Sequence, residues 1–199
     1  MPAKDSPTPP VDELGRLRDG TLVRVRSALP TDRLRVMEFL RHVSRNSLEQ
    51  RFLGAMRPET AAPEILRPCG PSDRVSLLLE LPGTTLVPVI AHGEYVRSES
   101  DPSRAEVAFL VADDRQGQGA ATLLLVQLAR RARSAGVQRF DALVLPENRP
   151  MLDVFLGAGF PCSLSVHDAL EHVSLDIARE PLSGTALMDS PGNRPRLRS

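Results

Sequence analysis

The sequence predicts one α/β (α+β) domain, built on a mixed, mostly antiparallel sheet of six to seven strands with helices on both faces. Two observations predict this fold. Residues 107–135 run from a nearly continuous apolar stretch, through a turn with two glycines, into a helical pattern. Around this unit, short alternating runs separated by turn residues indicate further strands. At 199 residues, a single domain with a substantial core is the expected organisation.

The first half of the chain predicts one strand followed by two helices. Residues 21–28 alternate between apolar and charged side chains, which is typical of a strand. Apolar residues recur at helical spacing over 34–43, and a shorter helix is expected to begin at Ser47, as N-cap, and run through Leu53. Residues 57–71 hold four prolines and predict a loop with one short helical turn.

The second half predicts the rest of the sheet. The helix of the central stretch ends at Gly136, and a short helix is expected over 148–157. The remaining strands are expected over residues 74–81, 85–97, from 105 to the central loop, 139–145, 162–166 and 171–177.

The two ends of the chain and its composition limit the class of protein. Residues 1–14 are rich in Pro, Ser and Asp and residues 179–199 in Pro, Gly, Ser and Arg, which predicts a disordered lead and tail around a domain over 15–178. With 25 Lys+Arg against 25 Asp+Glu, the chain lacks the basic surplus of a nucleic-acid binder. Two cysteines indicate no disulfide framework, and no stretch resembles a signal peptide or a membrane span. We therefore expect a cytoplasmic protein with no nucleic-acid or membrane partner.

The glycine turn predicts an anion site, because free amides lie at a helix N-terminus. A nucleoside triphosphatase loop would need Lys followed by Ser or Thr after its last glycine, but Ala120 follows Gly119 here. A dinucleotide-binding loop would need a third glycine or alanine where Thr122 stands. Both of these nucleotide-binding readings fail on the residues present.

The turn resembles instead the pyrophosphate loop of the GCN5-related N-acetyltransferase (GNAT) superfamily, whose pattern is Gln or Arg, two residues, Gly, one residue, then Gly or Ala. The matching string is Gln116-Gly117-Gln118-Gly119-Ala120-Ala121. This resemblance implies the acyl-CoA N-acyltransferase fold, acetyl-CoA as co-substrate and no metal. It also implies cofactor contacts from the loop through Thr122, from the backbone of Leu110 and Val111 where the strand splays, and from Asn148. An N-cap is the alternative role for Asn148.

Glu106 is the candidate general base. It lies one residue inside an apolar strand, so partial desolvation is expected to raise the pKa of its carboxyl. The resemblance implies the same role, since superfamily members that act on lysine commonly place a glutamate on this strand. The alternative is a strand-end glutamate in solvent or in a salt bridge. Many family members use a tyrosine as general acid where this chain has Phe155, so the leaving thiolate lacks that proton donor.

The predicted activity is transfer of an acetyl group to a primary amine, directly, in a ternary complex. A narrower resemblance joins residues of the two early helices to bacterial protein lysine acetyltransferases: Ser44, Ser47, Arg51 and Phe52. It implies a protein lysine as acceptor and a protein partner such as an acyl-CoA synthetase. A small-molecule amine and a catalytically weak acyl-CoA-binding regulatory module stay open as alternatives, and the protein is expected to be a monomer or a homodimer. The four histidines have no metal-ligand spacing.

Overall fold

The computed structural model describes residues 12–68, 73–83 and 88–181. Its strands are β1 (Asp12–Arg16), β2 (Leu22–Ser27), β3 (Arg74–Glu80), β4 (Val89–Arg97), β5 (Arg104–Val111), β6 (Arg139–Val144), β7 (Cys162–His167) and β8 (Leu170–Asp176). Within these residues they form one sheet in the order β1-β2-β3-β4-β5-β6-β8-β7, in which the pair β5–β6 is parallel and the other pairs are antiparallel. The mixed, mostly antiparallel sheet is confirmed, with eight strands rather than six to seven.

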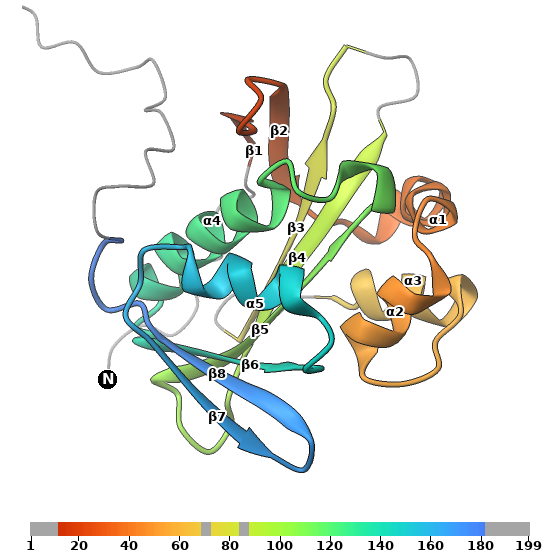
Figure 1. The fold of residues 1–199 in the computed structure, drawn as a ribbon. Helices are drawn as coiled ribbons and strands as arrows, with labels where there is room; N and C mark the ends of the chain where they lie inside the picture. The colour runs from red at the N-terminus through yellow and green to blue at the C-terminus, as the bar shows by residue number, and fades with distance from the viewer. Residues whose placement is uncertain (1–11, 69–72, 84–87, 182–199) are drawn as a thin grey trace, which may run out of the picture.

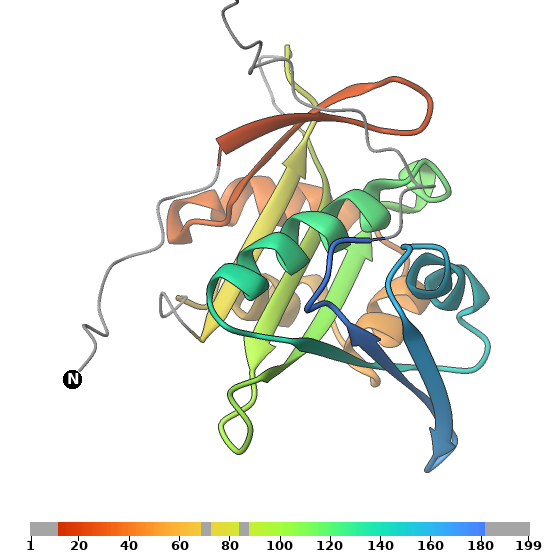
Figure 2. The same cartoon turned by 90° about the vertical axis from the view of Figure 1, so that its left-hand side faces the viewer.

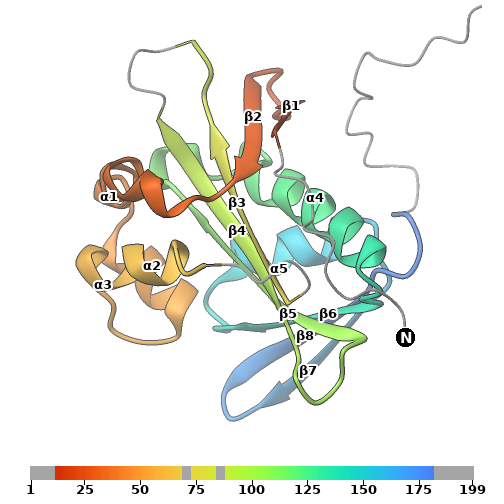
Figure 3. The same cartoon turned by 180° about the vertical axis from the view of Figure 1, so that it is seen from behind.

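Helices cover both faces of the sheet, as predicted. They are α1 (Arg33–Arg41), α2 (Arg45–Phe52), α3 (Pro58–Ile65), α4 (Ala120–Ser134) and α5 (Arg149–Leu156). In Figure 1 the central strands run diagonally across the view, with α4 on the left and α1, α2 and α3 on the right. Figure 2 shows α4 lying across the strands, and the view from behind in Figure 3 shows the three early helices on the opposite face.

The larger core lies on the α4 side. Leu124, Leu125 and Leu128 of α4 are fully buried against the sheet, as their helical spacing predicts. Gly93 permits the close approach of this helix: a Cβ there would lie 2.9 Å from Phe109 Cδ1 and 3.2 Å from Leu124 Cβ. A smaller apolar cluster, built around Phe39 of α1, fills the space between the sheet and the three early helices.

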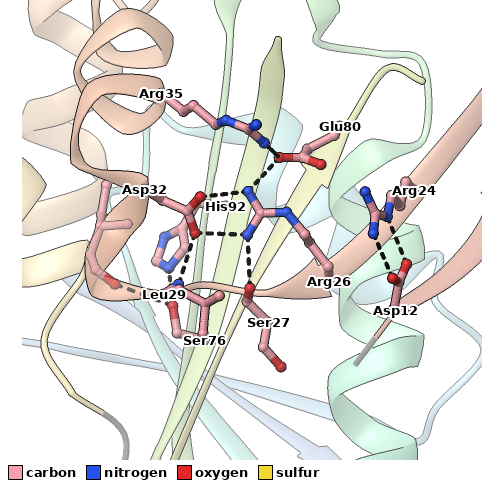
Figure 4. Close-up of polar contacts among 11 residues, drawn as sticks. Asp12, Arg24, Arg26, Ser27, Leu29, Asp32, Arg35, Ser76, Glu80 and His92 are labelled. Carbon is pink, nitrogen blue, oxygen red and sulfur yellow. Dashed lines mark hydrogen bonds and ion pairs between the residues drawn. The ribbon is translucent and has the colours of Figure 1, made fainter. Parts of the chain in front are cut away.

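A buried ion cluster fastens the early helices to the sheet. Arg26 of β2 donates to both carboxylate oxygens of Asp32, at 2.7 Å each, and to Glu80 of β3 (Figure 4). Arg35 of α1 reaches the same Glu80 oxygen at 3.3 Å. Although burial opposes it, the bonds to the two carboxylates raise the pKa of Arg26 above its ordinary value. We call these four residues the Arg26 cluster.

β1 was not predicted, and residues 12–14 therefore do not belong to a disordered lead. The strand pairs with β2 along its whole length, yet its apolar side chain, Leu14, is 60% exposed. Main-chain pairing at a sheet edge leaves no apolar periodicity in the sequence, which explains the miss. The rest of the predicted lead, residues 1–11, and the tail from residue 182 lie outside the described residues.

Two helix predictions were also wrong in detail. Residues 57–71 were expected to form a loop, but 58–65 form α3, because Pro58 occupies the first turn, where a proline costs no hydrogen bond, and Ala61, Ala62 and Ile65 are buried. The N-cap of α2 is Ser44, which accepts from the Ser47 amide, rather than Ser47 itself. In the described part of the chain, no helix is both long and apolar enough to cross a membrane.

Candidate functional site

The strands β5 and β6 separate, and the opening between them is the candidate site. They pair from Arg104 to Glu106 against Arg139 to Asp141, and beyond that point β6 continues beside β8 alone. A cavity of about 310 Å³ fills the opening and is lined by Val107–Val111 of β5 and by residues of β6, α2, α4 and α5. The strand splay expected at Leu110 and Val111 is therefore present.

Main-chain groups of alternate β5 residues point into this opening. The Ala112 amide donates to Ile90 O at 3.0 Å, and Val111 pairs with Ala91. Because hydrogen-bonded and non-bonded pairs alternate along antiparallel strands, Val111 and Phe109 turn their N–H and C=O groups away from β4. Leu110 lines the cavity, but the same alternation turns its main-chain groups toward His92 on β4.

The glycine loop forms the mouth of the cavity. Gly117 and Gly119 adopt positive φ angles of 75° and 91°, and Gly119 is the N-cap of α4. The first amides of α4, at Ala120–Thr122, have no partner within the helix. Of the predicted loop residues, all but Gln118 line the cavity: Gln116, Gly117, Gly119, Ala120, Ala121 and Thr122. The structure thus brings the predicted cofactor residues together around one opening.

The Gln116 side chain ties the loop to its surroundings. Its Nε2 lies 3.4 Å from Ser47 Oγ, 3.4 Å from Asp113 Oδ1 and 3.5 Å from Val111 O. Ser47 in turn donates to Asp113 at 2.9 Å. The loop is therefore anchored to α2, and its free amides are held in one orientation at the end of β5.

Two arginines beside the loop were missed in the sequence. Arg18 and Arg115 both line the cavity. The turn between β1 and β2 brings Arg18 to the loop, where its amide donates to Gln118 O at 3.1 Å, and a Cβ on Gly119 would lie 2.9 Å from Arg18 Cγ. A signal for Arg18 would have required recognising the β1–β2 hairpin, because more than 90 residues separate it from the loop.

Asn148 and Phe155 lie on the far wall of the cavity. Asn148 is the N-cap of α5, and its side chain accepts from the Met151 amide at 3.3 Å, as the alternative interpretation predicted. Phe155 is buried, with its ring centroid 6.0 Å from that of Phe109. Tyr95 is also buried, against Phe140 at 5.7 Å, which agrees with the packing role expected for it.

Glu106 lies where the strands begin to separate. It pairs with Val96 on one side and Asp141 on the other, and it shares a face with Ala108, which lines the cavity. Its side chain is exposed, so the expected desolvation is wrong. Apolar neighbours along a strand do not bury a side chain unless another element covers it. Among the described residues Glu106 forms no salt bridge, although its charge acts on the nearby Arg51 guanidinium group.

A second buried ion cluster lies beside the cavity, between α2 and the sheet. Arg51 of α2 and Arg74 of β3 both pair with Glu94 of β4, and the three side chains are between 10% and 12% exposed. Arg74 also donates to Glu64 O at 2.6 Å and Arg67 O at 3.2 Å, so it caps the end of α3. We call Arg51, Arg74 and Glu94 the Arg51 cluster.

Burial and charge set the ionisation of this cluster. Burial lowers the pKa of Arg51, against the raising effect of Glu94. Burial raises the pKa of a carboxyl, but the basic neighbours of Glu94 outweigh that effect and hold its pKa below the ordinary value. The adjacent His92 is fully buried, which lowers its pKa to about 4, and its Nε2 lies 2.9 Å from Ser76 Oγ. At neutral pH, His92 is therefore uncharged.

Comparison with known proteins places this arrangement in a family. The sequence profile described as the acetyltransferase (GNAT) family matches residues 45–160. Acetyltransferase Pat of Mycolicibacterium smegmatis is 36% identical over 146 residues, which cover 72% of this chain and 43% of that protein. The chain thus spans less than half the length of this relative. In the described residues, no group of three or more His, Cys, Asp or Glu side chains could hold a metal ion.

Solved structures agree with that match. The GNAT domain of S. lividans PAT superposes with a TM-score of 0.74 at 33% identity, covering 83% of this chain and 96% of that one. A cAMP-binding acyltransferase from Mycobacterium smegmatis superposes with a TM-score of 0.61 at 26% identity, covering 92% and 51%. The diaminobutyrate acetyltransferase EctA from Paenibacillus lautus, solved with its substrate and coenzyme A, shares the fold, with a TM-score of 0.61 at 21% identity over 81% of this chain and 98% of that one.

Proposed function

Because the chain belongs to the GNAT acetyltransferase family, we propose that it transfers an acetyl group from acetyl-CoA to a primary amine, most suitably a lysine side chain of a protein. The observation that carries this proposal is the β5–β6 opening, which ends at the glycine loop and the N-terminus of α4. The opening offers main-chain hydrogen-bonding groups along its length and an anion site at its mouth, as an acyl-CoA requires.

The cofactor enters with its pyrophosphate at the loop. The free amides at the start of α4 receive the phosphate oxygens, and Arg18 and Arg115 supply positive charge beside them. The pantetheine arm extends along β5 and completes its unpaired edge. Phe109 and Val111 are better suited than Leu110 to bond this arm, because the ladder alternation turns their amides into the opening.

The acyl group then lies at the inner end of the opening, near Glu106. The exposed Glu106 carboxylate takes the proton of the incoming amine, which attacks the thioester directly in a ternary complex. This route needs no acyl-enzyme intermediate. Of the two cysteines, Cys162 lies on β7, outside the cavity lining, and Cys69 lies outside the described residues.

A protein lysine is favoured as acceptor by two observations. The relatives with the highest sequence identity above are the Pat acetyltransferase and the GNAT domain of a PAT protein. The α2 face that lines the cavity carries Ser47 and Arg51, two of the residues on which the protein acetyltransferase resemblance depends. An acyl-CoA synthetase is the kind of protein partner we propose. Phe155, which has no proton to donate, keeps a slow or regulatory acyl-CoA-binding module as the second candidate.

Thermal melting with and without acetyl-CoA tests the proposal. A ligand at 100 times its dissociation constant adds about 2.7 kcal/mol, which raises the melting temperature of a domain of this size by roughly 5 °C or more. Gly119→Glu should abolish the shift, because its φ is positive and its Cβ would meet Arg18. Gly136→Glu is the matched control, since Gly136 also has a positive φ but nothing within 4 Å of its Cβ.

Glu106→Gln separates catalysis from binding. This variant should keep the acetyl-CoA shift and lose turnover on lysine peptides or proteins by about 100-fold or more, in line with the loss of a general base. Retained turnover would remove Glu106 from the mechanism. Binding of acetyl-CoA without turnover by the wild-type chain, on both protein and small amines, would favour the regulatory module.

A further inference from the structure

Arg51 brings a charged group to the wall of the opening. It lies one helical turn after Ser47, and both residues line the cavity together with Gln50. One guanidinium nitrogen of Arg51, Nη2, bonds Glu94, and Nε is buried without a partner. Its third nitrogen, Nη1, has no hydrogen bond within the described residues and is not fully buried. Arg51, which lines the cavity, therefore has donor capacity to spare.

The Arg51 cluster carries an unbalanced charge. Two guanidinium groups share the single carboxylate of Glu94, and the neighbouring His92 is uncharged at neutral pH. Among these buried groups one positive charge is in excess, and the other carboxylate that acts on Arg51 is that of the exposed Glu106. A charge in such surroundings acts on a nearby charge far more strongly than it would in bulk solvent.

The excess positive charge lies beside the inner end of the opening, near Ala108. Glu94, which holds Arg51, pairs directly with Ala108, and Ala108 lines the cavity. The opening closes two residues further on, where Glu106 pairs with Asp141. An acyl group at the end of the pantetheine arm must stop before that closure, so it lies beside Ala108 and Arg51.

The reaction creates negative charge at this point. The amine nitrogen forms a bond to the thioester carbon, and the carbonyl electron pair moves onto the oxygen. Glu106 has by then taken the first amine proton. When this oxyanion collapses, the C–S bond breaks, the sulfur leaves with the electron pair as a thiolate, and the second proton on the nitrogen passes to solvent. Phe155 cannot protonate the thiolate. The fixed positive charge of Arg51 is the group in this wall that can stabilise the developing negative charge.

We propose that Arg51 stabilises the oxyanion formed during acyl transfer, with Glu94 and Arg74 holding it in place. This inference rests on the proposed function and adds an electrostatic role for a side chain of α2. It also explains why a buried excess charge is present at all, because such a charge costs free energy unless another charge compensates it, and packing alone does not require it.

Steady-state kinetics on three variants test the role. Arg51→Met should lower kcat with acetyl-CoA by about 100-fold, the loss typical of one oxyanion donor, with little change in the KM for acetyl-CoA. Arg51→Lys, which keeps the charge, should lie between this variant and the wild type. Arg45→Met is the matched control: Arg45 is on the same helix, is exposed and pairs with Glu49. It should behave as the wild type.

Fluoroacetyl-CoA separates an electrostatic role from a structural one. The fluorine withdraws electrons and stabilises the oxyanion itself, so the kcat defect of Arg51→Met should shrink by about tenfold with this donor. A merely structural role would give the same defect with both donors, and that outcome would overturn the inference. If Arg51→Met does not fold, the ratio of the two donors in Arg51→Lys decides between the same outcomes.

The control reactions separate this inference from the proposed function. A wild-type chain that binds no acetyl-CoA and acetylates nothing overturns both. Turnover that is lost in Glu106→Gln but kept in Arg51→Met overturns the inference and leaves the proposed function standing.

Discussion

Two buried arginine clusters lie on the same face of the sheet, and they differ in charge balance. In the Arg26 cluster, two guanidinium groups meet two carboxylates, those of Asp32 and Glu80. In the Arg51 cluster, two guanidinium groups meet the single carboxylate of Glu94. The balanced cluster takes no part in lining the cavity, whereas Arg51 of the unbalanced one does.

This difference indicates separate roles for similar chemistry. A balanced buried cluster joins elements that are far apart in sequence, here β2, β3 and the start of α1, and each of its carboxylates pairs with at least one guanidinium group (Figure 4). In the Arg51 cluster one buried guanidinium group has no carboxylate of its own within the cluster, and the further carboxylate that acts on Arg51 is that of the exposed Glu106. The natural partner is a ligand or a transition state in the adjoining opening.

Breaking the balanced cluster should give the largest effect on stability. Arg26→Met leaves the buried Asp32 without a cation and Glu80 with the half-exposed Arg35 alone, which should lower the free energy of unfolding by about 3–5 kcal/mol, measured by urea denaturation. The acetyl-CoA melting shift of the folded fraction should persist. Arg24→Met is the control on the same strand, because its pair with Asp12 is half exposed and should contribute little to stability (Figure 4). Equal losses in the two variants would contradict the assignment.

His92, which lies beside the Arg51 cluster, should make the free energy of unfolding depend on pH. Burial lowers the pKa of His92 to about 4, below the value near 6.5 of the unfolded chain. Between these values the unfolded state binds the proton and the folded state does not, so stability is complete above pH 6.5 and falls as pH drops toward 4. The expected loss from this group is about 3 kcal/mol.

Denaturation at a series of pH values measures this slope. His92→Gln cannot take up the proton and should flatten the profile between pH 6.5 and 4, apart from what the carboxylates contribute. His42→Gln, at an exposed position on α1, should leave it unchanged. A His92→Gln profile as steep as that of the wild type would show that folding does not lower the pKa of His92.

The sequence predicted the parts of the fold whose side chains are buried in a regular period. The strand, loop and helix around Gly119, and the strands flanking them, appear close to their expected positions. β1 escaped because main-chain pairing, with Leu14 exposed, holds it in place. The prolines of α3 concealed a helix whose buried residues follow helical spacing.

The site was predictable where it depends on one continuous stretch and hidden where it depends on contacts across the chain. The loop residues from Gln116 to Thr122 are adjacent in sequence, so their grouping could be read directly. Arg51 and Glu94 are 43 residues apart, and their pairing requires α2 to lie on β4 and β5. The exposure of Glu106 likewise depends on which helices cover the sheet, and periodicity along one strand does not contain that information.

The smallest expected effect is on acetyl-CoA affinity, and it concerns Arg18 at the mouth of the opening. Arg18 is an exposed cation for which the described residues provide no ion-pair partner, and it lies beside the loop amides. If an arginine without an ion-pair partner binds the cofactor, Arg18→Ala should weaken acetyl-CoA binding by about tenfold, as expected for one charged hydrogen bond. Isothermal titration calorimetry measures the loss.

A cofactor series identifies the phosphate that Arg18 contacts. Dephospho-CoA lacks the 3′-phosphate, so an Arg18→Ala variant that binds CoA and dephospho-CoA equally, when the wild type prefers CoA, assigns Arg18 to that group. Equal weakening toward both ligands assigns it to the pyrophosphate. Arg16→Ala removes an arginine from the same hairpin that bonds Gly20 O and does not line the cavity. An equal loss of affinity in Arg16→Ala would mean that the hairpin fold, rather than the Arg18 charge, supports the loop. The proposed link between an arginine without its own carboxylate and a bound ligand would then apply only to Arg51, at the inner end of the opening.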